Sequence, residues 1–133
     1  MLDPKSKFER VMLIDDNTID LYITARLMTK YNFGEEIDQY SSAKKALEFL
    51  QEKQNDFTKW PQIIFLDIYM PGMSGFEFMA EYNNLSSQLK KFCKVYMISS
   101  SIDENDIKRA KNDVNVVDFQ VKSLTKEFLN SII

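Results

Sequence analysis

Five side chains that can do chemistry have the same kind of place in this sequence: each lies where a short apolar run ends. They are Asp15, Asp16, Asp67, Ser99 and Lys122. Carboxylates close together in partly desolvated space repel one another, and a divalent cation removes that repulsion. Magnesium suits ligation by oxygen atoms alone, and a carboxylate can also act as a nucleophile. A hydroxyl and an ammonium group opposite would bind phosphoryl oxygens, so the set predicts transfer of a phosphoryl group onto an aspartate.

Each of these residues also has an ordinary structural interpretation. An acidic pair is favoured at the start of a helix, and Asp67 precedes the turn residues 71–72. Ser99 is the first of three consecutive serines, and a lysine near a strand end is commonly a surface charge. The joint pattern favours a site, because polar residues without a common role would scatter over both edges of a sheet.

Short apolar runs alternate with helical stripes along the whole chain. The runs 11–14, 63–66 and 95–98 are unbroken, as expected of strands buried on both faces of a sheet, and further strands are expected at 37–40 and 116–121. This alternation is typical of an α/β fold with a parallel sheet. Right-handed crossovers bring the carboxyl ends of all strands to one edge, where ligands bind. The five side chains are therefore expected to converge.

Two of the expected helices carry clear apolar stripes. The first helix is predicted to face the sheet with the apolar residues that recur at helical spacing: Ile19, Tyr22, Ile23, Leu27 and Tyr31. A later helix is expected to begin at a capping box of Ser74 and Glu77. Phe76, Met79 and Ala80 are predicted to form its inner face.

Two other segments have weak apolar signals. The polar stretch 83–91 is expected to be a loop that leads into the strand 95–98. The helix expected at 103–112 has few apolar anchors, chiefly Ile107 and Ala110. Because these two side chains bury little area, the helix is expected to be mobile.

The composition excludes several classes of chemistry. The chain has 133 residues, a formal charge of −3, no histidine and one cysteine. Histidine-dependent catalysis and cysteine-based zinc clusters are therefore excluded, and the acidic balance argues against nucleic-acid binding. No apolar run is long enough to cross a bilayer and no secretory signal is readable, so a cytoplasmic protein is expected. We expect an N-terminal extension, 1–8, and one domain, 9–133.

Three segments, 11–17, 66–75 and 95–99, resemble the response-regulator receiver domains of two-component signalling. The resemblance covers about residues 9–132. It implies a flavodoxin-like (βα)5 three-layer sandwich with a parallel five-stranded sheet of order 2-1-3-4-5. It also implies either a stand-alone receiver similar to chemotaxis regulators or a receiver cut from a longer protein.

The resemblance assigns a role to each residue of the metal site. Asp67 becomes the phosphoacceptor, and Asp16 a direct ligand of Mg²⁺. Asp15 becomes a partner that acts mainly through metal-bound water. The backbone carbonyl of Tyr69 completes the site.

The resemblance also implies how the phosphoryl group is held and how the domain then switches. Ser99 hydrogen-bonds the phosphoryl group, Lys122 pairs with it, and Phe119 is the switch aromatic that fills the space Ser99 leaves. The alternative for Phe119 is a plain core residue of its strand. The switch reshapes helix 103–112, strand 116–121 and the last helix, which then contact a downstream protein partner or a second receiver. The donor is a histidine kinase or phosphotransfer protein, or a small acyl phosphate, and the domain catalyses only its own phosphorylation and dephosphorylation.

Two positions stand out against the family pattern. The family usually has Lys-Pro after the fifth strand, often with a cis bond, and here the pair is Lys122-Ser123. A cis bond without proline costs about 3 to 4 kcal/mol, so we expect a trans bond, with Lys122 still reaching the site. Tyr69 is large for its position beside the phosphoacceptor. It either shields an acyl phosphate from water or is an exposed loop aromatic.

Two alternative functions remain open. A pseudo-receiver would use the same fold as a binding module that needs no phosphorylation, and both Ser123 and Tyr69 favour it. A magnesium-dependent phosphatase with an aspartyl nucleophile would share the acids and the lysine. Such enzymes typically carry a second aspartate two residues after the nucleophile, where this chain has Tyr69.

Overall fold

The computed structural model describes residues 6–101 and 103–132 of the chain. Residues 1–5 of the expected N-terminal extension and Ile133 lie outside the described residues. Within the described part, no helix has the length and apolar character needed to cross a membrane.

Five parallel strands form a sheet of order β2-β1-β3-β4-β5, which confirms the predicted flavodoxin-like topology. Their bounds are β1 (Phe8–Ile14), β2 (Gly34–Tyr40), β3 (Ile63–Asp67), β4 (Lys94–Ser99) and β5 (Val116–Val121). Every residue of the central strand β3 is buried, as expected of a strand covered on both faces. The edge strand β2 begins before the predicted residue 37, because its polar first residues still pair with β1.

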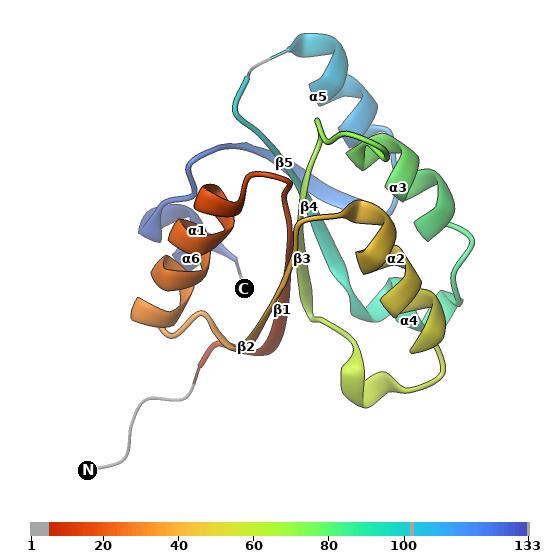
Figure 1. Ribbon diagram of the computed structural model, residues 1–133, viewed down its shortest axis with the longest axis horizontal. Helices are drawn as coiled ribbons and strands as arrows, with labels where there is room; N and C mark the ends of the chain where they lie inside the picture. The colour runs from red at the N-terminus through yellow and green to blue at the C-terminus, as the bar shows by residue number, and fades with distance from the viewer. Residues whose placement is uncertain (1–5, 102, 133) are drawn as a thin grey trace.

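Helices cover both faces of the sheet and complete a three-layer sandwich (Figure 1). One face carries α1 (Thr18–Lys30) and α6 (Lys126–Ser131). The other carries α2 (Ala43–Glu52), α3 (Gly75–Tyr82), α4 (Ser87–Phe92) and α5 (Glu104–Lys111). A short 3₁₀ helix, η1 (Phe57–Lys59), precedes β3.

Strand β1 contributes to both layers of the core. Met12 and Ile14 pack on the side of α2 to α5, whereas Val11 and Leu13 pack on the side of α1 and α6. This division follows from the two-residue period of a strand, which points successive side chains to opposite faces. An unbroken apolar run in the sequence therefore corresponds to two separate apolar cores.

Helix α1 faces the sheet with a different set of residues from the one predicted. Its buried residues are Leu21, Ala25 and Met28. Ile19 is 69% exposed, and Tyr22 and Ile23 are exposed as well. Of the predicted set, Leu27 packs against this core, so the predicted face is wrong for Ile19, Tyr22 and Ile23 but not for Leu27. Both sets have helical spacing, and periodicity identifies an apolar face without showing which of two such faces packs. The small Ala25 lies in the buried set, where it suits close packing of α1 on the sheet.

Helix α3 begins as predicted but is rotated relative to the expected face. The capping box is present: the Glu77 amide donates to Ser74 Oγ, and the Ser74 amide donates to Glu77 Oε1, both at 3.1 Å. Ala80 is exposed and Phe76 is half-buried, which corrects the predicted inner face. The buried residues are Gly75, Phe78, Met79 and Tyr82. The face turns because Gly75 packs against the backbone that follows β3.

The stretch 83–91, predicted to be a loop, contains most of helix α4. Its N-cap is Ser86, whose side chain accepts from the Leu89 amide at 3.3 Å. Leu89 is the one buried residue of this six-residue helix. A single buried apolar side chain leaves no periodic signal, which is why the sequence pattern missed the helix.

The burial in α1 predicts unequal effects of two alanine substitutions in the same helix. Leu21→Ala should lower the free energy of unfolding by about 2 to 5 kcal/mol, because it leaves a cavity in the core. Ile19→Ala should change it by less than about 0.5 kcal/mol, because the side chain is exposed. Urea unfolding followed by circular dichroism measures both. Equal losses, or a larger loss for Ile19→Ala, would restore the face predicted from the sequence.

Candidate functional site

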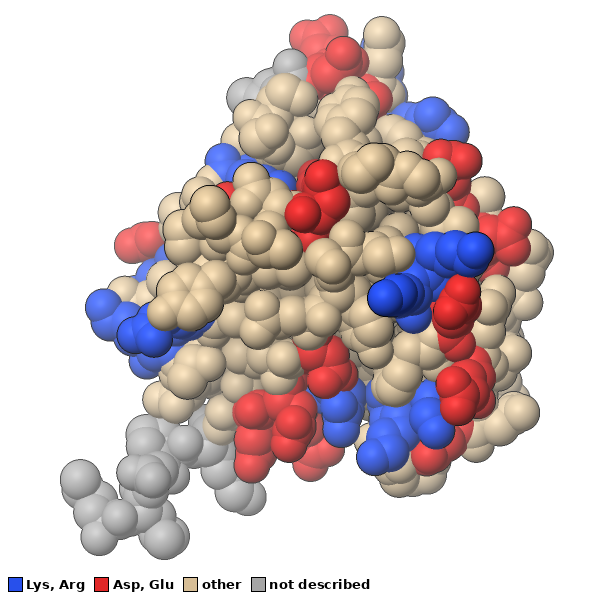
Figure 2. Space-filling view, viewed as in Figure 1, with Lys and Arg blue, Asp and Glu red and all other residues tan. Residues whose placement is uncertain are grey.

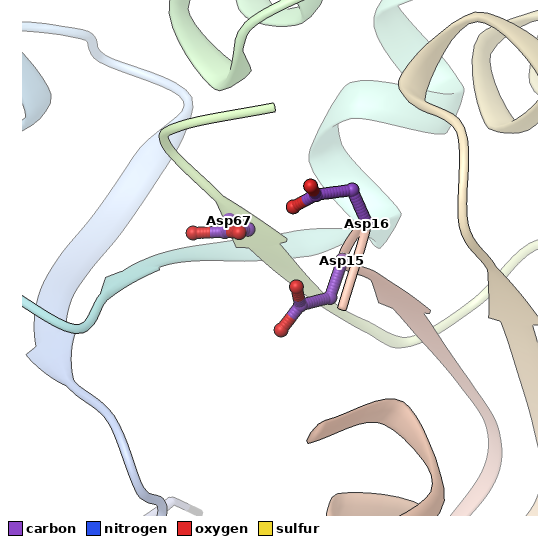
Figure 3. Close-up of side chains that lie close together, drawn as sticks. All are labelled: Asp15, Asp16 and Asp67. Atoms are coloured by element: carbon purple, nitrogen blue, oxygen red, sulfur yellow. The ribbon is translucent and has the colours of Figure 1, made fainter. Parts of the chain in front are cut away.

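The carboxyl ends of β1, β3 and β4 and the residue after β5 bring the predicted polar side chains to one edge of the sheet. Asp15 and Asp16 follow β1, Asp67 ends β3 and Ser99 ends β4, while Lys122 follows β5. One carboxylate oxygen from each of Asp15, Asp16 and Asp67 lies within 4.8 Å of the other two. Figure 3 shows these three side chains around a common space.

Asp15 is held by the start of helix α1. Its Oδ1 accepts from the Asn17 amide at 2.9 Å, and its own amide donates to the Tyr40 carbonyl oxygen at 3.0 Å. Asn17 is in turn the N-cap of α1 and accepts from the amides of Ile19 and Asp20 at 3.0 and 3.1 Å. Capping the helix therefore also orients the buried carboxylate of Asp15.

Asp67 lies at the base of a tightly packed loop between β3 and α3. Its side chain is buried, and the next residue, Ile68, pairs by its amide with the Ile98 carbonyl oxygen at 3.0 Å. The Gly75 amide donates back to the Ile68 carbonyl oxygen at 2.8 Å. A Cβ atom at Gly75 would lie 2.5 Å from the Asp67 carbonyl oxygen, so only glycine lets α3 approach Asp67 this closely.

Lys122 forms ion pairs with acids from three parts of the chain. Its Nζ lies 2.6 Å from Asp15 Oδ2 and 3.3 Å from Asp67 Oδ2. It also donates to Asp20 Oδ2 at 3.3 Å. The Lys122 amide donates to the Ser99 carbonyl oxygen at 2.9 Å, which ties the residue to the end of β4. The ammonium group therefore lies among three carboxylates.

The peptide bond between Lys122 and Ser123 is cis, so the prediction of a trans bond is wrong. That prediction used the average cost of a cis bond without proline, and an average over many proteins does not decide one bond in a folded site. The second half of the same prediction is confirmed, since Lys122 reaches the acids.

Asp20 belongs to the site, although it is not among the residues predicted from the sequence. It lies in the first turn of α1, three residues after the N-cap Asn17. Acidic residues are favoured in the first turn of any helix, so an aspartate there carries no specific signal. The useful signal was its position: the first turn after a strand-end acid pair lies at the same edge of the sheet.

Burial and charge act on the acids and the lysine in opposite directions. Burial, and then the charge of Asp15, raise the pKa of Asp67 to about 7, and the opposing effect of Lys122 is smaller. Burial acts to lower the pKa of Lys122, but its hydrogen bond to Asp15 and the charges of Asp67 and Asp15 raise it overall. Lys122 is therefore charged, yet one ammonium group does not fully offset the carboxylates around it.

Ser99 is buried at the end of β4, between the strands that carry Asp67 and Lys122. Its Oγ accepts from the Ser101 amide at 3.2 Å and lies 3.4 Å from Ser101 Oγ. Its backbone carbonyl is the acceptor for Lys122. The Ser99 hydroxyl thus lies at the carboxyl edge of the sheet, and its contacts are with Ser101 in the loop that follows β4.

Tyr69 contacts helix α5, whereas Phe119 packs on strand β5 against the larger core. Tyr69 is exposed, and its hydroxyl donates to the Asp106 carboxylate of α5. Phe119 lies opposite Met97 in the pairing of β4 with β5, and its half-buried ring packs against the larger core. Arg109, also of α5, lies 4.1 Å above the ring of Phe76. Helix α5 is held chiefly by such contacts, since Ala110 is its one buried residue.

The donor atoms at the acidic edge fit a hard divalent cation. Three carboxylates each offer an oxygen within a small space, and the chain has no histidine that could compete as a ligand. Oxygen ligands with an excess of negative charge are what Mg²⁺ prefers in proteins. The incomplete charge balance around Lys122 is consistent with a further cation.

Comparison with known proteins agrees with this fold. The sequence matches the family described as "Response regulator receiver domain" over residues 11–133, and the chain belongs to this family of two-component signalling domains. A two-component response regulator from Cytophaga hutchinsonii has a similar structure, with a TM-score of 0.86 and 30% identity. The match covers 96% of this chain and 94% of that chain.

Two curated relatives are similar over part of their length. Two-component response regulator ORR1 of Oryza sativa subsp. japonica is 31% identical over 117 residues, which is 86% of this chain and 49% of that protein. Hybrid signal transduction histidine kinase L of Dictyostelium discoideum is 33% identical over 75 residues, which is 56% of this chain and 4% of that protein. The chain spans about half the length of the first relative and a small part of the second.

The raised pKa of Asp67 predicts a pH-dependent effect of Asp67→Asn on stability. Between about pH 4 and pH 7 the folded state binds more protons at Asp67 than the unfolded state, so this residue's contribution to stability is lost as the pH rises. Asp67→Asn should therefore raise the free energy of unfolding at about pH 8 and change it little near pH 4. Urea unfolding in the presence of EDTA measures this difference.

The control is Glu81→Gln, at an exposed acid of α3. Its effect on the free energy of unfolding should be the same at both pH values. Added Mg²⁺ should stabilise the wild-type chain at about pH 8 more than Asp67→Asn. If Asp67→Asn is no more stable than wild type at that pH, the charge imbalance inferred at the site is absent.

Proposed function

We propose that this chain is a phosphoacceptor receiver that takes a phosphoryl group onto Asp67 and thereby switches a protein-interaction surface. The observation that supports it most directly is the contact of Lys122 with both Asp15 and Asp67 beside the three gathered carboxylates. Its family membership supports a place in two-component signalling. We further propose that it acts in the cytoplasm, as a signalling domain that catalyses only its own phosphorylation and dephosphorylation.

The proposed reaction is a single transfer at phosphorus. An Asp67 carboxylate oxygen forms a bond to phosphorus while the bond from phosphorus to the imidazole nitrogen of the donor's phosphohistidine breaks. The bonding pair leaves with that nitrogen, which is then protonated from solvent. The phosphohistidine must belong to another protein, because this chain has no histidine. That donor is a histidine kinase or phosphotransfer protein. A small acyl phosphate can also be the donor. The bond from phosphorus to the acyl oxygen then breaks, and the carboxylate leaves with the bonding pair.

Lys122 and Ser99 are proposed to hold the transferred group. The ammonium of Lys122 already lies 3.3 Å from Asp67 and would pair with a phosphoryl oxygen on it. Ser99 would exchange its hydrogen bond with Ser101 for one to the phosphoryl group. Asp15, Asp16, Asp67 and the backbone carbonyl of Tyr69 would hold Mg²⁺, whose charge would offset the carboxylates and favour the ionised form of Asp67.

The donor is proposed to dock on the exposed apolar residues of α1. Ile19, Tyr22 and Ile23 lie on the helix that begins beside Asp15 and carries Asp20. A donor helix that covers them would exclude water near the acids.

The proposed output involves α5, β5 and α6. Movement of Ser99 toward a phosphoryl group would leave space beside β4 that Phe119, half-buried on β5, can fill. Helix α5 buries little apolar surface, so a small change at its contacts can shift its position. The reshaped surface would bind a downstream protein or a second receiver.

Labelling with acetyl phosphate tests the proposed function. In the presence of Mg²⁺ the wild-type chain should gain one phosphoryl group, detected by intact mass, and beryllium fluoride should bind at the same site. Asp67→Asn should do neither, and EDTA should abolish both. Turnover of phosphomonoesters would instead indicate a phosphatase. Neither labelling nor turnover would indicate a binding module that needs no phosphorylation.

Tyr69 is predicted to slow loss of the phosphoryl group when Asp106 holds its ring in place. Tyr69→Ala should shorten the half-life of the phosphorylated chain by roughly twofold to tenfold, in line with loss of about one hydrogen bond. Asp106→Asn should have a smaller effect in the same direction. Glu104→Gln, at an exposed acid of the same helix, is the control and should have none. A phosphorylated Tyr69→Ala chain as long-lived as wild type would show that the side chain is an ordinary loop aromatic.

A further inference from the structure

Three aromatic side chains form an open cluster at the end of the molecule opposite the acids. Phe57 of η1 is 68% exposed and Phe92, the last residue of α4, is 41% exposed. The half-buried Trp60 lies between them, with ring centroids 6.4 Å from Phe57 and 5.8 Å from Phe92. Its indole nitrogen donates to the Lys53 carbonyl oxygen at 2.8 Å, so the ring is fixed. The cluster offers its rings to solvent.

A groove of about 560 Å³ runs between this cluster and the amino ends of β1 and β2. We call it the aromatic groove, and its residues are Phe57, Trp60, Phe92, Glu9, Glu35 and Glu36. The three glutamates are exposed, and the described residues include no ion-pair partner for any of them. Arg10, which also lines the groove, is already paired with Asp38 at 2.9 Å. Figure 2 shows acidic side chains at this lower end of the molecule, with basic side chains beside them.

We propose that the aromatic groove binds a basic peptide segment of a partner protein. The methylene stem of a lysine or arginine packs against aromatic rings, and its charged head is attracted to the ring faces. Glutamates on the opposite wall then pair with that head. The groove thus complements a cation flanked by apolar residues, both in shape and in charge.

Other occupants fit the groove less well. The three glutamates repel the negative phosphates of nucleic acid, and they repel an anionic membrane surface for the same reason. A second copy of the chain in the same orientation would bring two acidic rims together. A wholly apolar segment would leave the carboxylates without a partner. The charge on the groove therefore selects a basic partner.

The aromatic groove is separate from the proposed phosphorylation site. η1 precedes β3 and Phe92 precedes β4, so both lie at the amino edge of the sheet, whereas Asp67 lies at the carboxyl edge. Strands of five to seven residues separate the two edges, which is roughly 17 to 23 Å at about 3.3 Å per residue. Occupation of the groove is therefore expected to be independent of phosphorylation, and could recruit the chain to a partner in either state.

Trp60 is the one tryptophan of the chain, so its fluorescence reports directly on the groove. The full chain is titrated with the acetylated, amidated peptide Gly-Leu-Arg-Leu-Lys-Gly, and separately with the matched peptide Gly-Leu-Glu-Leu-Glu-Gly. The basic peptide should bind and shift the emission, and its affinity should fall as salt is added. The acidic peptide should bind at least about tenfold more weakly, since it meets like charges.

Variants locate the binding in the groove. Phe57→Ala, and separately the pair Glu35→Gln with Glu36→Gln, should each weaken binding about threefold to fivefold. The first removes one cation–π contact and the second removes the charges of two exposed glutamates. Both change exposed side chains, so the fold should persist. Val114→Ser, at a residue 95% exposed elsewhere on the surface, and Asp67→Asn should leave the affinity unchanged.

Three outcomes would overturn the proposal. These are no binding of the basic peptide at millimolar concentration, equal affinity for both peptides, and affinity that none of the groove variants changes. Self-association of the chain that Phe57→Ala abolishes, seen by sedimentation, would identify a second copy as the occupant instead.

Discussion

The structure depends on a charge balance around one ammonium group. Lys122 lies within ion-pair distance of Asp15, Asp20 and Asp67, and two of these acids are buried. Buried carboxylates this close together destabilise the folded chain unless a cation compensates them. Lys122 offsets this effect only in part, because burial, followed by the charge of Asp15, still raises the pKa of Asp67 to about 7. Two of the acids that Lys122 compensates, Asp15 and Asp67, also belong to the group of carboxylates that could hold a metal ion.

The sheet topology makes this balance possible. The order β2-β1-β3-β4-β5 sets the strand of Asp67 beside the strand that leads to Asp15, with β4 between Asp67 and Lys122. Lys122 consequently reaches across the end of β4, where Ser99 accepts from its amide. The polar groups at the strand ends lie together because parallel strands with right-handed crossovers share one carboxyl edge, and Asp20 joins them from the first turn of α1. The aromatic groove lies at the opposite, amino edge of the sheet, away from the acids that contact Lys122.

Packing and surface function compete for apolar residues in this fold. Helix α1 has two apolar sets, and the sheet takes Leu21, Ala25 and Met28 while Ile19 remains in solvent. Helix α5 shows the other extreme, with one buried residue and polar or aromatic contacts such as that of Arg109 with Phe76. An exposed apolar set and a weakly anchored helix both leave part of the molecule outside the packed core, where local stability is lowest.

The strands, the acids at their ends and the family could be predicted from the sequence, because they depend on short-range patterns: apolar runs, the residue after each run, and the capping box at Ser74. Other features depend on contacts between residues far apart in the chain. The orientation of α1, the contact of Asp20 with Lys122, and the packing of Phe92 on Trp60 are of this kind. Helical periodicity offered two faces for α1, and only packing against the sheet selected one. Local pattern thus determined which groups are present at each strand end, whereas the tertiary structure decided which of them touch.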